Sequence, residues 1–452
     1  MSDVIKLLQH AQIPLENTTL RRLSIIVIAM FTMTGRVTMR GIARWTGKGG
    51  SYRTIQRFFN TAIDWGQATW CLLWCHVLSP DDVIIVGGDE TVVTKAGTQT
   101  HGLDKFFSSI IGKPVRGIAI FTWSLISVNQ RRSFPLLNHQ IFRDPTGKQD
   151  DTVASVASKN KNKNKGKSKN KSKSTRKPGR PKGSKNQNRE DVELSPYLLT
   201  LQAQLRSLQQ LVGSRVALVY VVLDGAFGNN YALQMVQRCG MHLISKLKAN
   251  SALYFPYTGP YSGHGPRRKY GKNVDYADLP SQYRVQQSTE KEVLTEIYQM
   301  SVLHKLFPHT LNVVIIVKTH LKTQAQSHVI LFSNDRTLSS EILIEYYKLR
   351  FQLEFNFRDA KQYWGLEDFM NIKEQPLTTA FNLSFFLVNV SQILLASSRH
   401  THPDFSLEDL KAHFRGRKYV KETLKLLPEK PDPIVIQHIY DEVAKLGSIN
   451  VA

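Results

Sequence analysis

Apolar residues recur at helical spacing near the start of the chain. Residues 18–33, 38–47 and 51–60 each carry them three and four positions apart, which is the pattern of an amphipathic helix. From about residue 80 the pattern changes to unbroken apolar runs, which are typical of buried strands. These runs then alternate with helical segments. The pattern therefore predicts an N-terminal helical domain followed by an α/β core.

The two short helices of the N-terminal region are separated by a glycine-rich turn, and Ser51 stands where a helix N-cap is expected. This arrangement predicts a helix-turn-helix. The second helix has a polar face that would enter a DNA groove and an apolar face that would pack inward. The polar face is Arg53, Gln56 and Arg57, and the apolar face is Ile55, Phe58 and Phe59. A small helical bundle with a basic rim is the alternative.

Two aspartates follow apolar runs in the expected core. Residues 81–93 predict a buried strand that ends at Gly87, Gly88 and Asp89, and residues 216–223 predict another, ended by Asp224. Ligand sites of open α/β sheets lie at the carboxyl ends of strands. Each aspartate is therefore a candidate site residue, although an aspartate in a simple turn would look the same.

Two segments interrupt the expected core. Residues 159–189 contain eleven Lys and three Arg without an acidic residue, so they cannot bury a core and are expected to be disordered. Within them, "RKPGRPKGSK" resembles an AT-hook, which would place Arg180 in a narrow A·T minor groove. A nonspecific polybasic tether is the alternative. Residues 250–337 are predicted to form a β-rich insertion.

The formal net charge is +24 over 452 residues. It favours a polyanionic partner, most simply nucleic acid, over an anionic membrane surface. The apolar run at residues 377–398 carries Asn382, Asn389 and Gln392, so it predicts a buried helix and no membrane span. The N-terminus lacks the pattern of a signal peptide, and we expect a cytoplasmic protein.

Three cysteines occur, too few for a disulfide framework. Cys71 and Cys75 lie four apart on an expected helix, without a second Cys/His pair to complete a zinc motif. We interpret them as buried thiols in a reducing compartment.

Residues 346–365, "YYKLRFQLEFNFRDAKQYWG", are expected to form one amphipathic helix. On a helical wheel, a core stripe and an adjacent polar stripe each span about 80°. The core stripe is Tyr346, Leu349, Leu353, Phe357, Ala360 and Trp364, and the polar stripe is Tyr347, Arg350, Glu354, Arg358 and Lys361. One carboxylate among three cations suits a site that holds a metal ion together with phosphate groups.

The spacing of Tyr347, Arg350, Glu354 and Lys361 resembles the Y(2)R(3)E(6)K signature of the DDE transposases of bacterial insertion sequences. The segments "GGDETVV" and "VVLDGAFG" resemble the blocks that carry the first and second aspartates of that family. The resemblance extends from about residue 38 to about residue 400. It implies an RNase H-like mixed α/β core that is interrupted by a β-rich insertion.

The resemblance also implies roles for individual residues. Asp89, Asp224 and Glu354 would be the catalytic and metal-binding triad for two Mg²⁺ ions, with Mn²⁺ as a possible substitute. Tyr347, Arg350 and Lys361 would bind phosphates at the transposon end, and the helical wheel adds Arg358.

The implied activity is cleavage at the ends of the element and strand transfer into a target. The implied partner is double-stranded DNA, and a homodimer or larger assembly would form once two ends are paired. No membrane is implied, and the protein would lie in the bacterial cytoplasm on the nucleoid.

Two features depart from the family pattern. Related enzymes are similar in placing a tryptophan in the insertion to stack on a flipped base, yet none of the six Trp lies in residues 250–337. Tyr254, Phe255, Tyr257 and Tyr261 are the aromatic candidates there. The polybasic tract between the first and second aspartates is the other departure.

These patterns predict seven segments. They are an N-terminal DNA-binding domain (1–78), a first core segment (79–145), a disordered polybasic insertion (146–194), a second core segment (195–249), the β-rich insertion (250–337), a third core segment (338–400) and a C-terminal helical region (401–452). Two other functions remain open: a nuclease of the same fold without strand transfer, and a catalytically silent DNA-binding regulator.

Overall fold

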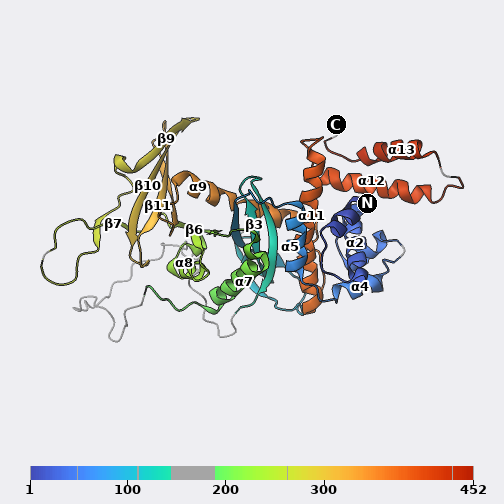
Figure 1. Ribbon diagram of the computed structural model, residues 1–452, viewed down its shortest axis with the longest axis horizontal. Helices are drawn as coiled ribbons and strands as arrows, with labels where there is room; N and C mark the ends of the chain where they lie inside the picture. Colours follow the sequence, from blue (N-terminus) through green and yellow to red (C-terminus); the bar gives the residue numbers. More distant parts are fainter. Residues whose placement is uncertain are drawn as a thin grey trace, which may run out of the picture. The chain divides into compact units, whose positions relative to one another are not determined.

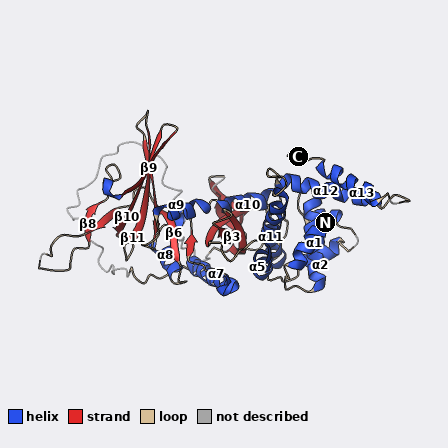
Figure 2. Ribbon diagram, turned by 45° about the horizontal axis from the view of Figure 1, so that its top comes forward, coloured by secondary structure: helices blue, strands red, loops and turns tan. Residues whose placement is uncertain are grey.

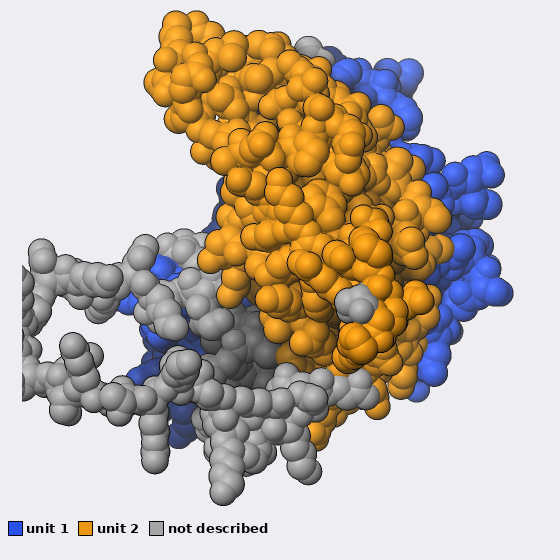
Figure 3. Space-filling view, turned by 90° about the vertical axis from the view of Figure 1, so that its left-hand side faces the viewer, with its two compact units in different colours: residues 1–143, 207–218, 349–452 blue, residues 144–206, 219–348 orange. Residues whose placement is uncertain are grey.

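The computed structural model describes residues 2–143 and 189–450, apart from Lys48, residues 109–110, Ser262 and Lys430. The predicted polybasic tract up to residue 188, with Arg180, lies outside the described residues. The chain divides into two compact units, coloured separately in Figure 3. Unit 1 comprises residues 1–143, 207–218 and 349–452, and unit 2 comprises residues 144–206 and 219–348.

The helices and strands of unit 1 are shown in Figure 1. They are α1 (Ser2–His10), α2 (Asn17–Thr32), α3 (Met39–Trp45), α4 (Tyr52–Phe59), α5 (Trp65–His76), β1 (Ile84–Thr94), β2 (Asp104–Ser108), β3 (Lys113–Ser127), β4 (Arg132–Ile141), α10 (Gln352–Gln362), α11 (Glu374–Arg399), α12 (Leu407–Leu424) and α13 (Pro433–Lys445). The helix α7 (Pro196–Val212) is shared between the two units.

Unit 1 is built on an antiparallel sheet in which β3 lies between β1 and β4 and also pairs with β2. The run of buried side chains from Gly117 to Ser127 explains why β3 is the interior strand. The helices α5, α10 and α11 pack against β4, and α10 also reaches β1. Figure 2 shows these three helices beside the sheet that contains β3. This packing places α10, with its polar side chains, beside β1, the strand that carries Asp89.

The predicted N-terminal helices are confirmed in position. Ser51 caps α4 by accepting a hydrogen bond from the backbone N–H of Thr54. The predicted apolar face of α4 is buried and the predicted polar face, Arg53, Gln56 and Arg57, is exposed. Contact with DNA and the domain boundary at residue 78 stay predictions.

The helix α11 is long and apolar enough to cross a membrane. However, 83% of its apolar window is buried inside the structure, and the core helix of a soluble protein passes the same test. Asn389 of α11 donates a hydrogen bond to the carbonyl of Pro135 in β4. The sequence prediction of a buried helix at residues 377–398 is confirmed.

The elements of unit 2 follow a different plan. They are β5 (Tyr220–Val222), the 3₁₀ turn η2 (Gly225–Phe227), α8 (Asn230–Gln237), β6 (His242–Leu247), β7 (Leu253–Pro256), β8 (Tyr270–Asn273), β9 (Arg284–Glu290), β10 (Val293–His304), β11 (Leu311–His320), β12 (Gln326–Ser333) and α9 (Ser340–Leu349). The strands β5 and β6 are parallel and are joined through α8, and β12 adds to β6 in the antiparallel sense.

The predicted strands in residues 250–337 therefore continue the sheet that β5 and β6 begin. The order across the sheet is β5, β6, β12, β11, β10, β7 and β8, with β9 paired to β10. Unit 2 is thus a mixed α/β structure. Together with the antiparallel sheet of unit 1, it is consistent with an RNase H-like fold, whereas the limits of an insertion domain stay a prediction.

The structure corrects two sequence predictions. The strand β1 does not end at Asp89, because the β-branched residues Thr91, Val92 and Val93 continue it to Thr94. Residues 346–365 do not form one helix, since α9 ends at Leu349 and α10 begins at Gln352. Neither proline nor glycine lies at this break, where the backbone N–H groups of Leu353 and Glu354 bond to carbonyls three residues back instead of four.

Candidate active site

Asp89 lies in the middle of β1, directly opposite Thr122 of β3. Side chains two positions apart on a strand share a face, so Asp89 points to the same side as Gly87. A Cβ atom on Gly87 would lie 2.8 Å from Cδ1 of Leu353 in α10 and 2.7 Å from Cδ1 of Ile126. The missing side chain thus lets α10 approach β1 closely on the face that carries Asp89.

Gly88 serves the opposite face in the same way. A Cβ atom there would lie 2.7 Å from the ring of Trp123 and 2.9 Å from the ring of Phe121. The glycine pair, which the sequence suggests as a strand end, is therefore a site of close packing inside a continuous strand.

Arg350 lies in the break between α9 and α10 and connects Asp89 to Glu354. Its Nη1 donates to Oδ2 of Asp89 at 2.9 Å, and its Nη2 donates to Oε1 of Glu354 at 3.4 Å. The backbone N–H groups of Leu353 and Glu354 bond to the carbonyls of Arg350 and Phe351, three residues back, so the first turn of α10 is tight. The break thus coincides with a guanidinium held between two carboxylates.

Burial makes this bridge more than a surface ion pair. The side chain of Arg350 is 15% exposed and that of Asp89 is 24% exposed, whereas Glu354 is 46% exposed. The Asp89 contact therefore lies in a region of low effective dielectric constant, and the Glu354 contact is screened by solvent. The guanidinium offsets the repulsion between two carboxylates that approach the same point.

The polar stripe of α10 has two further cations, and both have partners in unit 1. Lys361 is 17% exposed, donates from Nζ to the carbonyl of Val92 in β1 at 3.0 Å and lies 3.2 Å from Glu367. This holds the C-terminal end of α10 on the strand that carries Asp89. Two residues of the stripe predicted from the helical wheel, Arg350 and Lys361, thus both contact β1, despite the break in the helix.

Arg358 was predicted to bind phosphate from the helical wheel alone, because it is not part of the family signature. Its Nε and Nη2 atoms both donate to Oδ1 of Asp359, and its guanidinium lies 4.9 Å from the centre of the Phe355 ring. Burial raises the pKa of Asp359, while Arg358 acts to lower it. In this structure Arg358 neutralises its neighbour, so its contact with a DNA phosphate stays a prediction.

Asp224 belongs to unit 2 and follows β5 by two residues. Its carboxylate caps η2 by accepting from the backbone N–H of Ala226 at 3.1 Å, and its carbonyl accepts from the hydroxyl of Ser245 in β6 at 2.7 Å. The strand predicted at residues 216–223 is shortened to Tyr220–Val222, and Asp224 lies just beyond its end, as the sequence predicted. Its convergence with Asp89 and Glu354 stays a prediction.

Glycine again permits a close approach at this turn. A Cβ atom on Gly228 would lie 2.1 Å from the carbonyl oxygen of Lys246, so only glycine fits between the η2 turn and β6. The side chain of Lys246 is exposed, and it contacts the position of Gly225, next to Asp224. Sequence reasoning missed this cation, because only the tertiary pairing of β5 with β6 brings residue 246 beside residue 224.

Tyr347 lies in α9 of unit 2, and its side chain is half-buried. The preceding residue, Tyr346, is buried and packs edge-on against Tyr220 of β5, with ring centres 5.5 Å apart. This contact fixes α9 on its own sheet. The role of Tyr347 in phosphate binding stays a prediction.

The four aromatic candidates for base stacking lie in and after β7. Tyr254 packs edge-on against Tyr270, and Phe255 stacks on Tyr283. Tyr257 and Tyr261 lie under the guanidinium groups of Arg268 and Arg267, at 4.8 and 5.4 Å, and the ammonium group of Lys305 lies 4.9 Å from the ring of Tyr254. Of the four, Tyr261 combines an exposed ring with an adjacent cation, which is the combination that single-stranded nucleic acid requires.

The donors near Arg350 fit a divalent metal ion. Asp89 and Glu354 supply carboxylate oxygens, the ligands that Mg²⁺ and Mn²⁺ prefer, and both carboxylates reach one common cation. The partial exposure of Glu354 leaves a route for the ion. These two carboxylates of unit 1 would thus hold such an ion, with Asp224 as the predicted third ligand.

Comparison with known proteins bears on this geometry. A family model described as DDE superfamily endonuclease matches residues 10–301, more than half of the chain. The match includes Asp89 and Asp224, whereas Glu354 lies beyond its end. No curated protein matches the sequence significantly. By this match, and with two carboxylates held around one cation in unit 1, the chain belongs to the DDE superfamily of endonucleases.

Proposed function

We propose that this protein is a transposase that binds the ends of an insertion sequence, cleaves DNA there and joins the freed ends to a target. Membership of the DDE endonucleases supports metal-dependent DNA cleavage as the activity and DNA as the substrate. The observation that carries the proposal further is the bridge from Arg350 to Asp89 and Glu354. It joins β1 to Glu354 of α10 through two of the four residues that match the transposase signature, Arg350 and Glu354.

Asp89, Asp224 and Glu354 are the proposed ligands of two Mg²⁺ ions, with Mn²⁺ as a substitute. When bound, the ions would supply an activated water and neutralise the negative charge on the phosphate oxygens. In the first step, water attacks the phosphodiester at the end of the element and releases a 3′-hydroxyl. In the second, this hydroxyl attacks a target phosphodiester, and a target 3′-hydroxyl leaves.

The cations of the chain position the DNA in this proposal. Arg350 and Lys361 bind phosphates at the transposon end, and their contacts with Asp89 and with the carbonyl of Val92 keep both cations beside β1. Tyr347 and Arg358 are the other two proposed phosphate contacts. The exposed face of α4, Arg53, Gln56 and Arg57, reads the terminal sequence in the major groove.

The test uses the full chain and a duplex that carries the DNA flanking its coding sequence. Asp89→Asn, Asp224→Asn and Glu354→Gln should each abolish Mg²⁺-dependent cleavage and leave DNA binding within a few-fold of wild type. Glu90→Gln is the matched control, because Glu90 is exposed and adjoins Asp89 on the opposite face of β1. Cleavage that survives in the Glu354→Gln variant would overturn the assignment of the third carboxylate.

Two competing functions give different outcomes in the same reactions. A nuclease of this fold would cut the duplex but form no joined product with an added target DNA. A DNA-binding regulator would bind the duplex equally with and without Mg²⁺ and would never cut it. The two carboxylates held around one cation favour an enzyme over a regulator.

A further inference from the structure

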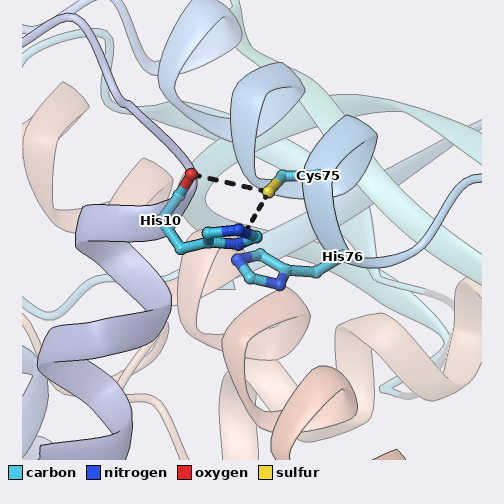
Figure 4. A group of neighbouring side chains, drawn as sticks. All are labelled: His10, Cys75 and His76. Carbon is cyan, nitrogen blue, oxygen red and sulfur yellow. Dashed lines mark hydrogen bonds between the residues drawn. The ribbon is translucent and has the colours of Figure 1, made fainter.

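Three metal-ligating side chains meet in unit 1, away from the acidic residues of β1 and α10. His10 is the last residue of α1, and Cys75 and His76 are the last two residues of α5 (Figure 4). One potential ligand atom from each lies within 4.8 Å of the other two. The sequence did not suggest this group, because His10 is 65 residues from Cys75 and the local spacing around Cys75 holds no metal motif.

The distances are close to those of a metal centre. The Sγ atom of Cys75 lies 3.2 Å from Nδ1 of His10. A tetrahedral zinc ion, with bonds of about 2.3 Å to sulfur and about 2.0 Å to nitrogen, holds such a pair about 3.5 Å apart. Small side-chain rotations would therefore bring the three atoms onto one ion.

His76 is oriented in the manner of a metal ligand. Its Nε2 lies 3.0 Å from the carbonyl oxygen of Leu7 in α1, a contact in which the ring N–H donates to the carbonyl and Nδ1 is left as the atom with a lone pair. Histidines that bind metals nearly always donate the other ring N–H to a carbonyl or carboxylate in this way.

The surrounding backbone also favours a cation. The group lies where α1 and α5 both end, and the carbonyl ends of helices carry partial negative charge. His10 is exposed, and Cys75 and His76 are partly exposed, so an ion and a water ligand can reach the group. The interpretation of Cys71 and Cys75 as buried thiols is wrong, because both are only half-buried and Cys75 faces His10.

We propose that His10, Cys75 and His76 form a binding site for Zn²⁺, with water as the fourth ligand. Thiolate and imidazole are ligands of borderline softness that select zinc over Mg²⁺, which prefers oxygen. A cysteine beside a single histidine would also suit a catalytic nucleophile. Here a second imidazole lies close to the same thiol, and this favours a metal-binding role over a nucleophilic one. The ion would fasten the N-terminal helix α1 to α5.

Metal content gives the first test. Full-length protein without an affinity tag is exposed to ZnCl₂, dialysed against buffer with a weak chelator, and analysed for zinc. Wild type should retain one more equivalent than Cys75→Ser and than His10→Gln. Cys71→Ser is the matched control, since Cys71 lies one turn earlier on the same helix and pairs with Gln67 instead. Asp89→Asn should also retain the ion, which separates this site from the acidic one.

Thiol protection gives a second test that needs no variant and so does not depend on a mutant folding. Wild-type protein is alkylated with iodoacetamide with and without ZnCl₂, and each cysteine is quantified by mass spectrometry. Zinc should slow modification of Cys75 at least 10-fold and leave the rate at Cys71 unchanged. Equal rates at Cys75 with and without zinc, or equal protection of Cys71, would overturn the proposal.

Discussion

At the scale of single residues, Arg350 is the side chain that holds Asp89 and Glu354 together. Without it, the two carboxylates would lose their shared counter-charge in a partly buried region. Breaking a fully buried ion pair costs several kcal/mol, and exposed pairs contribute up to about 1 kcal/mol. Because these groups lie between the two cases, we expect Arg350→Ala to lower the free energy of unfolding by about 1–3 kcal/mol.

Urea unfolding without divalent ions measures this change. Arg350→Lys should recover some of the loss, because an ammonium group carries the charge but lacks the fork that reaches two carboxylates. Millimolar Mg²⁺ should reduce the deficit of Arg350→Ala, since a divalent ion offers the same two carboxylates a counter-charge. Lys425→Ala, which removes an exposed pair with Glu422, is the control. A variant Arg350→Ala as stable as wild type would show that the bridge contributes nothing.

The burial of Lys411 in α12 leads to a prediction about how stability depends on pH. Its ammonium group donates to the carbonyls of Met30 and Tyr363 and lies over the ring of Trp364, and burial lowers its pKa to about 8. An unfolded lysine titrates near 10.4. Between about pH 8 and 10.4 the unfolded chain therefore binds more protons at this site, and the contribution of Lys411 to stability rises with pH.

Replacing Lys411 by methionine removes that contribution. The difference in unfolding free energy, wild type minus Lys411→Met, should increase between about pH 7.5 and about pH 9.5 in urea titrations. Lys425→Met, at an exposed position on the same chain, should show no such trend. Parallel pH profiles for wild type and Lys411→Met would contradict the lowered pKa.

At the scale of elements, the position of α10 depends on the absence of a side chain at Gly87. Alanine there would push its Cβ against the tips of Leu353 and Ile126, both of which are fully buried. Overpacking of this kind typically costs about 1–3 kcal/mol. We expect Gly87→Ala to lose about 1–2 kcal/mol of stability and also to lose cleavage activity at temperatures where it is still folded, because Glu354 moves with α10.

Gly97→Ala is the control for this experiment. A Cβ atom on Gly97 would meet its nearest neighbour at 3.9 Å, which is ordinary contact. The measurements are thermal unfolding and cleavage of the end-bearing duplex. If Gly87→Ala cleaves at the wild-type rate, the close approach of α10 to β1 does not determine the geometry of the site.

The elements also show how far sequence patterns extend. The burial of Leu349, Leu353, Phe357 and Trp364 follows from helical spacing, and the structure confirms this stripe. The break at Arg350 does not follow from spacing, because residues 346–365 contain no proline and their only glycine is the last residue. At the break Arg350 bridges to Asp89, 261 positions away, and local periodicity cannot report such a contact.

At the scale of the whole molecule, the proposed function requires Asp224 of unit 2 to share metal ions with Asp89 and Glu354 of unit 1. Iron-directed cleavage tests this without measuring activity. Fe²⁺ in place of Mg²⁺ generates hydroxyl radicals with ascorbate and peroxide, and these cut the backbone near the bound ion. We expect cuts close to residues 89, 224 and 354, mapped by mass spectrometry.

The proposed His10, Cys75 and His76 site is first saturated with Zn²⁺, so that iron binds elsewhere. The double variant Asp89→Asn, Glu354→Gln should lose all three sets of cuts, including those near Asp224. Cuts near residues 89 and 354 alone would mean that Asp224 is not a ligand, and the proposed triad would fail even if the family assignment stands.

The sequence by itself determined where many of the helices and strands of this protein lie along the chain. Apolar spacing located the N-terminal helices, the cap at Ser51, the strands between residues 250 and 337 and the buried helix α11, because these depend on neighbours within a few positions. Motif spacing pointed to Asp89, Asp224 and Glu354, whose roles stay predictions; residues 89 and 224 lie within the segment that the family model matches.

Tertiary structure alone decided the contacts between distant residues. It showed that the glycines before Asp89 serve close packing, that Arg350 bridges two carboxylates, that Lys246 lies beside the turn of Asp224, and that His10 meets Cys75. Each of these depends on segments tens or hundreds of residues apart being brought together by burial of apolar surface. Burial is not directional, so the pattern of a sequence indicates which faces are buried but leaves open which partners they meet.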